Sequence, residues 1–251
     1  MARDDTAPRS KRGGSQCATT RGALFSRRAY DARVSNVASP SSPEPRARVV
    51  EAFIDYSSPY AYLGSTQIER VAREQDARVV WRPFLLGALF REIGTPLVPI
   101  DAAPPAKRTY MRLDMERFAA RYGVPFRFAT RFPLRTVDAL RLTLLAPEEK
   151  RSALVHAIFE ATWAHDRDPA SREVLVDAAA RAGLDPALVD RTAEAKQALV
   201  DATSEAVARG VPGAPTFVVG DQLFWGQDRL HFVARALAGW RPRGDSLTFS
   251  P

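Results

Sequence analysis

Ser58 lies at a predicted helix start, where a serine hydroxyl can hydrogen-bond an anion. It lies in Asp55-Tyr56-Ser57-Ser58-Pro59-Tyr60, directly after a strand-like run. A serine followed by proline is typical of a helix start, with the serine as N-cap and the proline at the first helical position. A helix N-terminus attracts anions, and a serine hydroxyl there can donate a hydrogen bond to a thiolate. Such a site lowers a thiol pKa from about 8.5 toward neutrality. The alternative is that Ser58 only caps the helix.

A second informative segment is Val211-Pro212-Gly213-Ala214-Pro215-Thr216-Phe217, a proline-rich turn that runs into an apolar strand. Only about 5–6% of X–Pro bonds are cis in folded proteins, so an ordinary loop proline is one interpretation. The position of Pro215 directly before a strand favours a cis-proline loop, in which Ala214 offers its backbone to a thiol-bearing peptide. The two segments together resemble the two halves of a thioredoxin-type active site, with Ser58 in place of the redox cysteine.

Charged residues elsewhere offer candidates for a ligand's charged ends. Asp228, after Gln227, lies where a last helix is expected to begin, and its carboxylate can bind an ammonium group. It is equally well explained as an acidic residue in the first turn of a helix. Lys107 and Tyr110 begin the first helix of a long helical block, where most such residues are solvated surface.

These residues need a scaffold, and hydrophobic periodicity supplies one. We predict a strand at 49–55, a helix at 59–74 and a second strand at 79–84 that is parallel to the first. The pattern is helical almost throughout 106–209, and two hairpin-like strands at 216–219 and 223–225 precede a last helix at 228–238. This order predicts an α/β, thioredoxin-like fold with a large all-helical insertion between its β-α-β and β-β-α halves.

We expect the chain to divide into four parts. Residues 1–48 form a disordered basic tail and linker, residues 49–84 and 210–239 form the thioredoxin-like domain, residues 85–209 form the helical insertion, and residues 240–251 form a C-terminal tail. The tail 1–48 holds ten basic and four acidic residues, so it carries +6 of the formal net charge of +7. The body is therefore close to neutral, which argues against nucleic acid as a partner.

Cysteine and histidine usage excludes other kinds of site. Cys17, the single cysteine, lies in the tail, so the body has no disulfide, no CxxC redox pair and no cysteine metal site. The three histidines lack the spacing of a metal motif. We find no secretory signal and no apolar run long enough to cross a bilayer. The expectation is a cytoplasmic protein with no metal and no membrane partner.

Residues 49–239 resemble the 2-hydroxychromene-2-carboxylate isomerases, which are close to the kappa-class glutathione transferases. The matching motifs are Phe53 to Leu63, Lys107 to Arg117, Gly123-Val124-Pro125, Phe132-Pro133, Ala139-Leu140-Arg141, Gly213 to Phe217, and Phe224-Trp225-Gly226-Gln227-Asp228-Arg229-Leu230. The resemblance implies a DsbA-like thioredoxin fold, glutathione as cofactor and a homodimer.

The resemblance also implies roles for individual residues. Ser58 matches the catalytic serine, while Ala214 and Pro215 match the backbone site for the glutathione cysteine. Gln227 and Asp228 match the γ-glutamyl anchors, and Lys107 matches a basic residue near a carboxylate. Tyr56, Thr95 and Arg135 are expected to face the second substrate. Thr95 and Arg135 replace asparagines that are common in the family.

The hypothesis from the sequence is a glutathione-dependent isomerase of an aromatic-degradation intermediate. In it, a thiolate held by Ser58 adds to a conjugated carbon, rotation follows, and elimination returns the cofactor. One alternative is a kappa-like glutathione transferase or peroxidase that acts on electrophiles. Another is a non-catalytic thioredoxin-like binding protein. The missing cysteines argue against a disulfide oxidoreductase.

Overall fold

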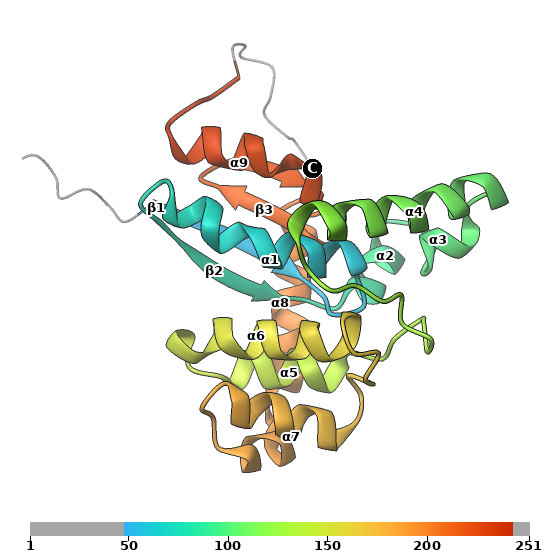
Figure 1. Ribbon diagram of the computed structural model, residues 1–251. Coiled ribbons are helices and arrows are strands. Elements are labelled where there is room, and N and C mark those ends of the chain that lie inside the picture. The colour runs from blue at the N-terminus through green and yellow to red at the C-terminus, as the bar shows by residue number, and fades with distance from the viewer. Residues whose placement is uncertain (1–47, 243–251) are drawn as a thin grey trace, which may run out of the picture. The chain divides into compact units, whose positions relative to one another are not determined.

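The computed structural model describes residues 48–242. A four-stranded sheet with the order β2-β1-β3-β4 forms its centre (Figure 1). β1 and β2 are parallel, as predicted, while β3 is antiparallel to both β1 and β4. The strands are β1 (Arg48–Ile54), β2 (Ala77–Pro83), β3 (Thr216–Val219) and β4 (Gln222–Trp225).

Helices cover both faces of this sheet. α1 and α9 pack against each other on one face, and α8 runs along the other, behind the sheet in Figure 1. α5, α6 and α7 form a separate helical group together with the 3-10 helix η1. The helices are α1 (Pro59–Arg73), α2 (Leu86–Glu92), α3 (Pro99–Ala102), α4 (Pro105–Tyr122), α5 (Val137–Leu145), α6 (Glu148–Trp163), α7 (Arg172–Arg181), η1 (Pro186–Ala195), α8 (Lys196–Ala208), η2 (Gln227–Arg229) and α9 (Leu230–Leu237).

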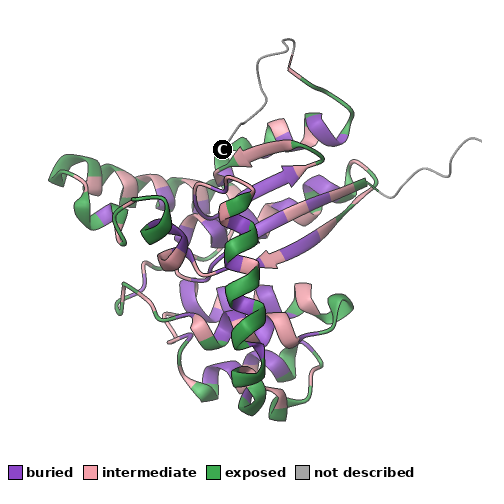
Figure 2. Cartoon of the chain, turned by 180° about the vertical axis from the view of Figure 1, so that it is seen from behind, coloured by how far each residue is buried: buried purple, intermediate pink, exposed green. Residues whose placement is uncertain are grey.

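The buried side chains gather between the sheet, α1 and the helices α5 and α6, whereas α4 and α8 are largely exposed (Figure 2). The largest fully buried side chain is that of Trp163, at the end of α6. Its ring stacks on Phe126 and meets Phe128 edge-on, with centroid distances of 6.1 and 5.8 Å. This aromatic cluster joins α6 to the chain segment that follows α4.

The thioredoxin-like fold with a mostly helical insertion is confirmed, with two local differences. The helical pattern was expected to be interrupted at Gly123-Val124-Pro125 by a turn only, but the whole segment 123–136 is irregular. Gly123 ends α4 in the left-handed conformation, and Phe126, Phe128 and Phe132 then turn inward onto Trp163. The last helix was expected from residue 228, but α9 begins at Leu230, because the backbone first closes a 3-10 turn from Arg229 N to Gly226 O at 3.2 Å.

The expected tails, 1–48 and 240–251, lie almost entirely outside the described residues, and so does Cys17. Arg48 itself begins β1. The division between a thioredoxin-like domain and a helical insertion at residues 84 and 210 stays a prediction. None of the helices within residues 48–242 is both long enough and apolar enough to cross a membrane.

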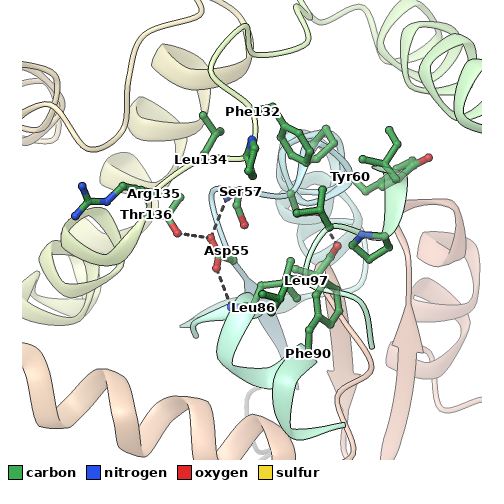
Figure 3. A pocket seen from close by; sticks show the side chains of 18 of the residues that line it. Asp55, Ser57, Tyr60, Leu86, Phe90, Leu97, Phe132, Leu134, Arg135 and Thr136 are labelled. Atoms are coloured by element: carbon green, nitrogen blue, oxygen red, sulfur yellow. Dashed lines mark hydrogen bonds between the residues drawn. The ribbon is translucent and has the colours of Figure 1, made fainter. Parts of the chain in front are cut away.

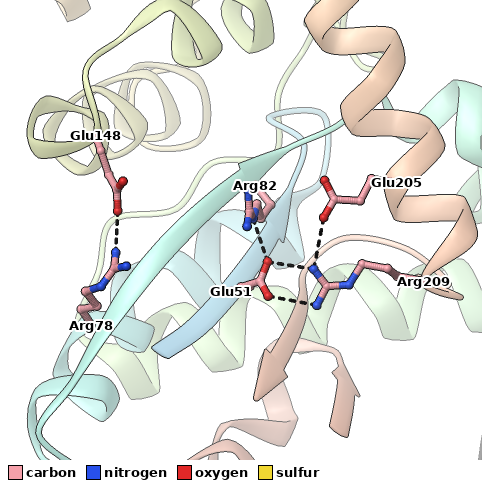
Figure 4. Close-up of polar contacts among 6 residues, drawn as sticks. All are labelled: Glu51, Arg78, Arg82, Glu148, Glu205 and Arg209. Atoms are coloured by element: carbon pink, nitrogen blue, oxygen red, sulfur yellow. Dashed lines mark hydrogen bonds and ion pairs between the residues drawn. The ribbon is translucent and has the colours of Figure 1, made fainter. Parts of the chain in front are cut away.

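Glu51, on β1, is the centre of an ion-pair network with Arg82 of β2 and Arg209 at the end of α8 (Figure 4). Its carboxylate accepts hydrogen bonds from Arg209 at 2.8 and 3.0 Å and from Arg82 at 2.7 Å. Arg209 also bonds Glu205 at 3.3 Å and lies over the ring of Phe53 at 5.0 Å. The network therefore ties β1 and β2 to the end of α8.

The network makes stability depend on pH. The hydrogen bond from Arg209, followed in effect by that from Arg82, holds the pKa of Glu51 below its ordinary value of 4.5 despite partial burial. A lowered folded-state pKa stabilises the fold above the unfolded value, and this contribution is lost as the pH falls through the folded value. We expect Glu51→Gln to lower the free energy of unfolding by about 1 kcal/mol at pH 7 and by less at pH 3. Urea titrations of both proteins at the two pH values measure this, and an equal difference at both would contradict it.

Candidate active site at the start of helix α1

Ser58 is the N-cap of α1, as its position before Pro59 predicted. Its side-chain oxygen accepts a hydrogen bond from the backbone N–H of Ala61 at 3.1 Å, and the residue is 5% exposed. Pro59 occupies the first turn, where a missing N–H costs nothing. The positive end of the α1 dipole thus lies at the Ser58 hydroxyl.

The same hydroxyl reaches across to the second informative segment. Ser58 Oγ donates a hydrogen bond to the carbonyl oxygen of Ala214 at 2.7 Å, which joins residues 156 positions apart. The Ala214–Pro215 peptide bond is cis. α1 approaches this loop closely at Gly64, where an added Cβ would lie 3.1 Å from both Pro215 and Phe217. The two predicted halves of the site are therefore in contact.

Side chains of α5 and α6 contact Tyr56, in the loop before Ser58. The hydroxyl of Tyr56 shares a hydrogen bond of 2.6 Å with Thr143 Oγ1 on α5, and its ring meets Phe159 edge-on. Trp163 Nε1 donates to the carbonyl oxygen of Tyr56 at 2.8 Å. Burial is the main reason that the pKa of the Tyr56 hydroxyl is raised. Tyr56 is fully buried, and its side chain lines neither of the cavities described next.

An apolar cavity of about 360 Å³ opens beside Ser58 (Figure 3). Ser58, Pro59, Tyr60 and Ala214 border it on the thioredoxin-like side. Its other walls come from α2, from the segment around α3, from α4 and from the irregular segment that precedes α5. The apolar residues on these walls include Leu86, Phe90, Leu97, Ile100, Met111, Met115, Phe128, Phe132 and Leu134.

A second, polar cavity of about 260 Å³ lies on the opposite side of Tyr60 and Ala214, which border both cavities. Its walls carry the charged residues Asp114, Asp228 and Arg229, and its remaining lining residues are Pro215, Trp225, Gly226 and Gln227. The side chain of Gln227 is held by the hydroxyl of Tyr122, which donates to Oε1 at 2.5 Å.

Electrostatics in the polar cavity favour a cation. Burial, and then the negative charges of Asp114 and Asp228, raise the pKa of Tyr60 to about 12. Asp228 pairs with the neighbouring Arg229, whereas Asp114 has no ion-pair partner among residues 48–242. The cavity thus offers an ammonium group the carboxylate of Asp114 and that of Asp228, the second of which is shared with Arg229.

The structure brings five of the predicted residues together: Ser58, Ala214, Pro215, Gln227 and Asp228. Arg135 borders the apolar cavity, but its guanidinium points away from the side chains around Ser57 and Asp55 (Figure 3). Lys107, exposed in the first turn of α4, and Thr95, whose N–H donates to Phe90 O at 2.8 Å, line neither cavity. Their contacts with a ligand, like those of Tyr56, stay predictions.

Sequence reasoning missed Asp114, Met111, Met115 and the lining role of Tyr60. Met111 and Met115 are four residues apart, so they share one face of α4, and Asp114 lies one turn after Tyr110. That spacing was a usable signal for Met111 and Met115. Nothing local distinguished Asp114 from a solvated helix residue, because its meeting with residues 225–229 is a tertiary contact.

The arrangement suits a ligand with a charged, peptide-like part and a reactive thiol. The polar cavity receives the charged part, the α1 N-terminus and Ser58 stabilise negative charge on sulfur, and the apolar cavity receives a second molecule.

Known proteins resemble this chain over most of residues 48–242. A family model described as a DSBA-like thioredoxin domain matches residues 49–238. A 2-hydroxychromene-2-carboxylate isomerase of Sphingobium xenophagum is 30% identical over 189 residues, which cover 74% of this chain and 96% of that protein. A glutathione S-transferase kappa 2 of Caenorhabditis elegans is 28% identical over 212 residues, covering 77% and 93% of the two chains.

Among solved structures, a 2-hydroxychromene-2-carboxylate isomerase superposes with a TM-score of 0.67 at 22% identity, over 76% of this chain and 95% of the other. That similarity bears on the fold. With the family model covering most of its length, this chain belongs to the DSBA-like thioredoxin domain family, as a relative of the 2-hydroxychromene-2-carboxylate isomerases and the kappa-class glutathione transferases.

Proposed function

We propose that this chain is a glutathione-dependent isomerase that converts 2-hydroxychromene-2-carboxylate, or a related aromatic-degradation intermediate, to trans-o-hydroxybenzylidenepyruvate. The observation that carries the proposal is that a polar and an apolar cavity share the bordering residues Tyr60 and Ala214, while Ser58, which is hydrogen-bonded to Ala214, borders the apolar one. An isomerase of this kind must hold a hydrophilic thiol and an aromatic ring side by side. The named isomerase relatives support the choice of reaction.

The residues present fit glutathione by their chemistry. Asp228 and Asp114 can bind the ammonium of its γ-glutamyl group, with Gln227 beside them, and the backbone of Ala214 can pair with its cysteine. Bound glutathione supplies a thiolate that can add reversibly to a conjugated carbon, which permits rotation about the resulting single bond. The backbone N–H groups at the start of α1 and the hydroxyl of Ser58 can stabilise the negative charge of that sulfur.

The chain's own contribution is charge stabilisation and orientation. In the structure, the proton of Ser58 Oγ points to the carbonyl oxygen of Ala214. Rotation about the Cβ–Oγ bond redirects this proton toward the apolar cavity that Ser58 borders, where it stabilises negative charge on sulfur, while Oγ still accepts the hydrogen bond from Ala61 N–H. The apolar walls exclude water and hold an aromatic ring against Tyr60. Arg135, at the edge of the apolar cavity, is the nearest candidate to bind a substrate carboxylate once its side chain turns inward.

A kappa-like glutathione transferase or peroxidase is the second candidate, because kappa-class transferases are also relatives and the same site serves both reactions. The homodimer that the resemblance implies and the cytoplasmic location expected from the composition stay predictions.

The proposal is tested by titrating glutathione onto the protein and following ultraviolet absorbance of the thiolate, then adding the chromene carboxylate. We expect a thiolate band near neutral pH, isomerised product and full recovery of glutathione. Consumption of glutathione with accumulation of a conjugate favours the transferase. Absence of binding at millimolar glutathione would exclude both and leave a thioredoxin-like binding protein.

Asp228 provides a sharper test of the polar cavity. Asp228→Asn removes a negative charge from an ammonium site, and a hydrogen bond to a charged group contributes about 1.5–3 kcal/mol. We therefore expect glutathione to bind about tenfold more weakly, measured by calorimetry. Asp221→Asn is the matched control, because Asp221 pairs with Arg241 and lines neither cavity. Equal affinity of the two variants would contradict the assignment of Asp228.

A further inference from the structure

Asp55 is a buried carboxylate for which the proposed reaction has no use. It begins the loop that leads from β1 to Ser58 and is 1% exposed. Its Oδ1 accepts hydrogen bonds from the N–H of Ser57 at 2.9 Å and from Thr136 Oγ1 at 2.7 Å. Its Oδ2 accepts one from the N–H of Leu86 at 2.8 Å. Figure 3 shows all three bonds converging on this one side chain.

Each donor belongs to a different part of the chain. Ser57 precedes the capping serine of α1, and Leu86 is the first residue of α2. The residue at the N-cap of α2, Leu85, has no side chain that can accept a hydrogen bond, so Asp55 serves as the cap from a distance. Thr136 is the N-cap residue of α5. One carboxylate therefore links the starts of three helices.

All four residues of this cluster, Asp55, Ser57, Leu86 and Thr136, line the apolar cavity. α2 contributes Leu86 and Phe90 to one wall, and the segment that ends at Thr136 contributes Leu134 to another. The hydrogen bonds of Asp55 to Leu86 and Thr136 thus connect these two walls. Burial of an ionisable carboxyl is costly, and here it raises the pKa of Asp55 above its ordinary value of 3.8. A costly buried acid beside a ligand cavity is a common sign of a functional role.

We propose that Asp55 is a positioning residue, whose three hydrogen bonds hold the walls of the apolar cavity at the separation that admits an aromatic molecule beside Ser58. It acts through Ser57, Leu86 and Thr136 and does not touch the reacting atoms. The kinetic part of the inference rests on the proposed function, whereas its structural part holds for any apolar ligand of this cavity.

Asp55→Asn is the direct test. The amide oxygen can still accept from Ser57 and Thr136, but the NH₂ group then faces the N–H of Leu86, and two donors cannot bond. Loss of one such hydrogen bond changes an equilibrium constant about tenfold. We therefore expect the backbone amide of Leu86 to exchange its hydrogen with solvent about ten times faster. We also expect tenfold weaker binding of anilinonaphthalene sulfonate, an aromatic probe, and a raised KM for the aromatic substrate with kcat and glutathione affinity unchanged.

Thr136 tests the same link without altering a charge. Thr136→Val removes the hydroxyl at constant shape, and we expect it to weaken probe binding. Thr136→Ser keeps the hydroxyl, and we expect probe binding as in the wild-type protein. Thr162→Val is the control, because Thr162 is also buried but bonds only within α6, to Ile158 O at 2.8 Å. This series remains decisive if Asp55→Asn fails to fold.

Unchanged Leu86 exchange in Asp55→Asn, or unchanged probe affinity in Thr136→Val, would overturn the positioning role. Failure of the wild-type protein to bind glutathione, with these variants behaving as expected, would overturn the proposed function alone.

Discussion

Replacing Ser58 with alanine is expected to abolish the thiolate band of bound glutathione near neutral pH and to lower kcat/KM about 100-fold. Removal of one preorganised donor to a developing anion commonly costs a factor of this size. The thiol pKa should rise toward its ordinary value of about 8.5, because the hydroxyl donor is lost. The α1 dipole remains and keeps part of the lowering. Glutathione affinity should change little, because Asp114 and Asp228 are untouched. Absorbance titration and steady-state kinetics measure both effects.

Two further variants separate thiol stabilisation from helix capping. Ser58→Gly keeps most of the N-cap stability, whereas Ser58→Ala costs about 1 kcal/mol of it, yet both lack the hydroxyl. Equal losses of activity in the two would identify the hydroxyl as the cause. Ser65→Ala is the control, because Ser65 lies in the same helix and only bonds Tyr62 O at 2.7 Å. Full activity of Ser58→Ala at neutral pH would exclude the proposed role of this serine.

Trp163→Ala is expected to lower the free energy of unfolding by about 3–5 kcal/mol, the largest stability effect that we predict for one side chain. Trp163 is fully buried, and its truncation leaves a cavity among Phe126, Phe128 and Phe132. It also leaves the carbonyl oxygen of Tyr56 without the indole donor. Denaturant titrations followed by circular dichroism measure the change.

The indole N–H can be tested apart from the packing. Trp163→Phe keeps an aromatic ring but leaves the Tyr56 carbonyl unsatisfied, which we expect to cost about 1–3 kcal/mol of stability. Trp240→Ala, at a partly exposed ring that packs on Phe232, should cost clearly less than Trp163→Ala. A Trp163→Ala protein as stable as Trp240→Ala would show that the aromatic cluster does not hold the fold together.

The features that sequence revealed are those with local causes. A serine before a proline caps a helix wherever it occurs, and a proline-rich turn before an apolar run starts a strand, so Ser58, α1 and β3 were placed correctly. The parallel pairing of β1 and β2 followed from the helix between them. The start of α9 was missed because a 3-10 turn and the first turn of an α-helix have similar sequence patterns.

The features that sequence did not reveal depend on contacts between distant residues. Residues 123–136 are irregular because three phenylalanines pack on Trp163, and no periodicity within the segment encodes that contact. Tyr56 lies in the same motif as Ser58, but its hydroxyl is taken by Thr143, 87 residues away. The acceptor role of Asp55 needs donors at residues 86 and 136. A motif thus located the loop but not the direction of each side chain in it.

The two cavities draw their walls from different stretches of the chain, and this has an evolutionary consequence. Apart from Asp114 and Tyr60, the polar cavity is built from residues 214–229, whereas most of the apolar walls come from residues 85–137. Substitutions in the second stretch, other than at Asp114 and Tyr122, can therefore remodel what is held next to Ser58 while the polar cavity keeps its shape. A duplicated gene could acquire specificity for a new aromatic compound by substitutions confined to residues 85–137. A combinatorial library restricted to those residues would test this route in the laboratory.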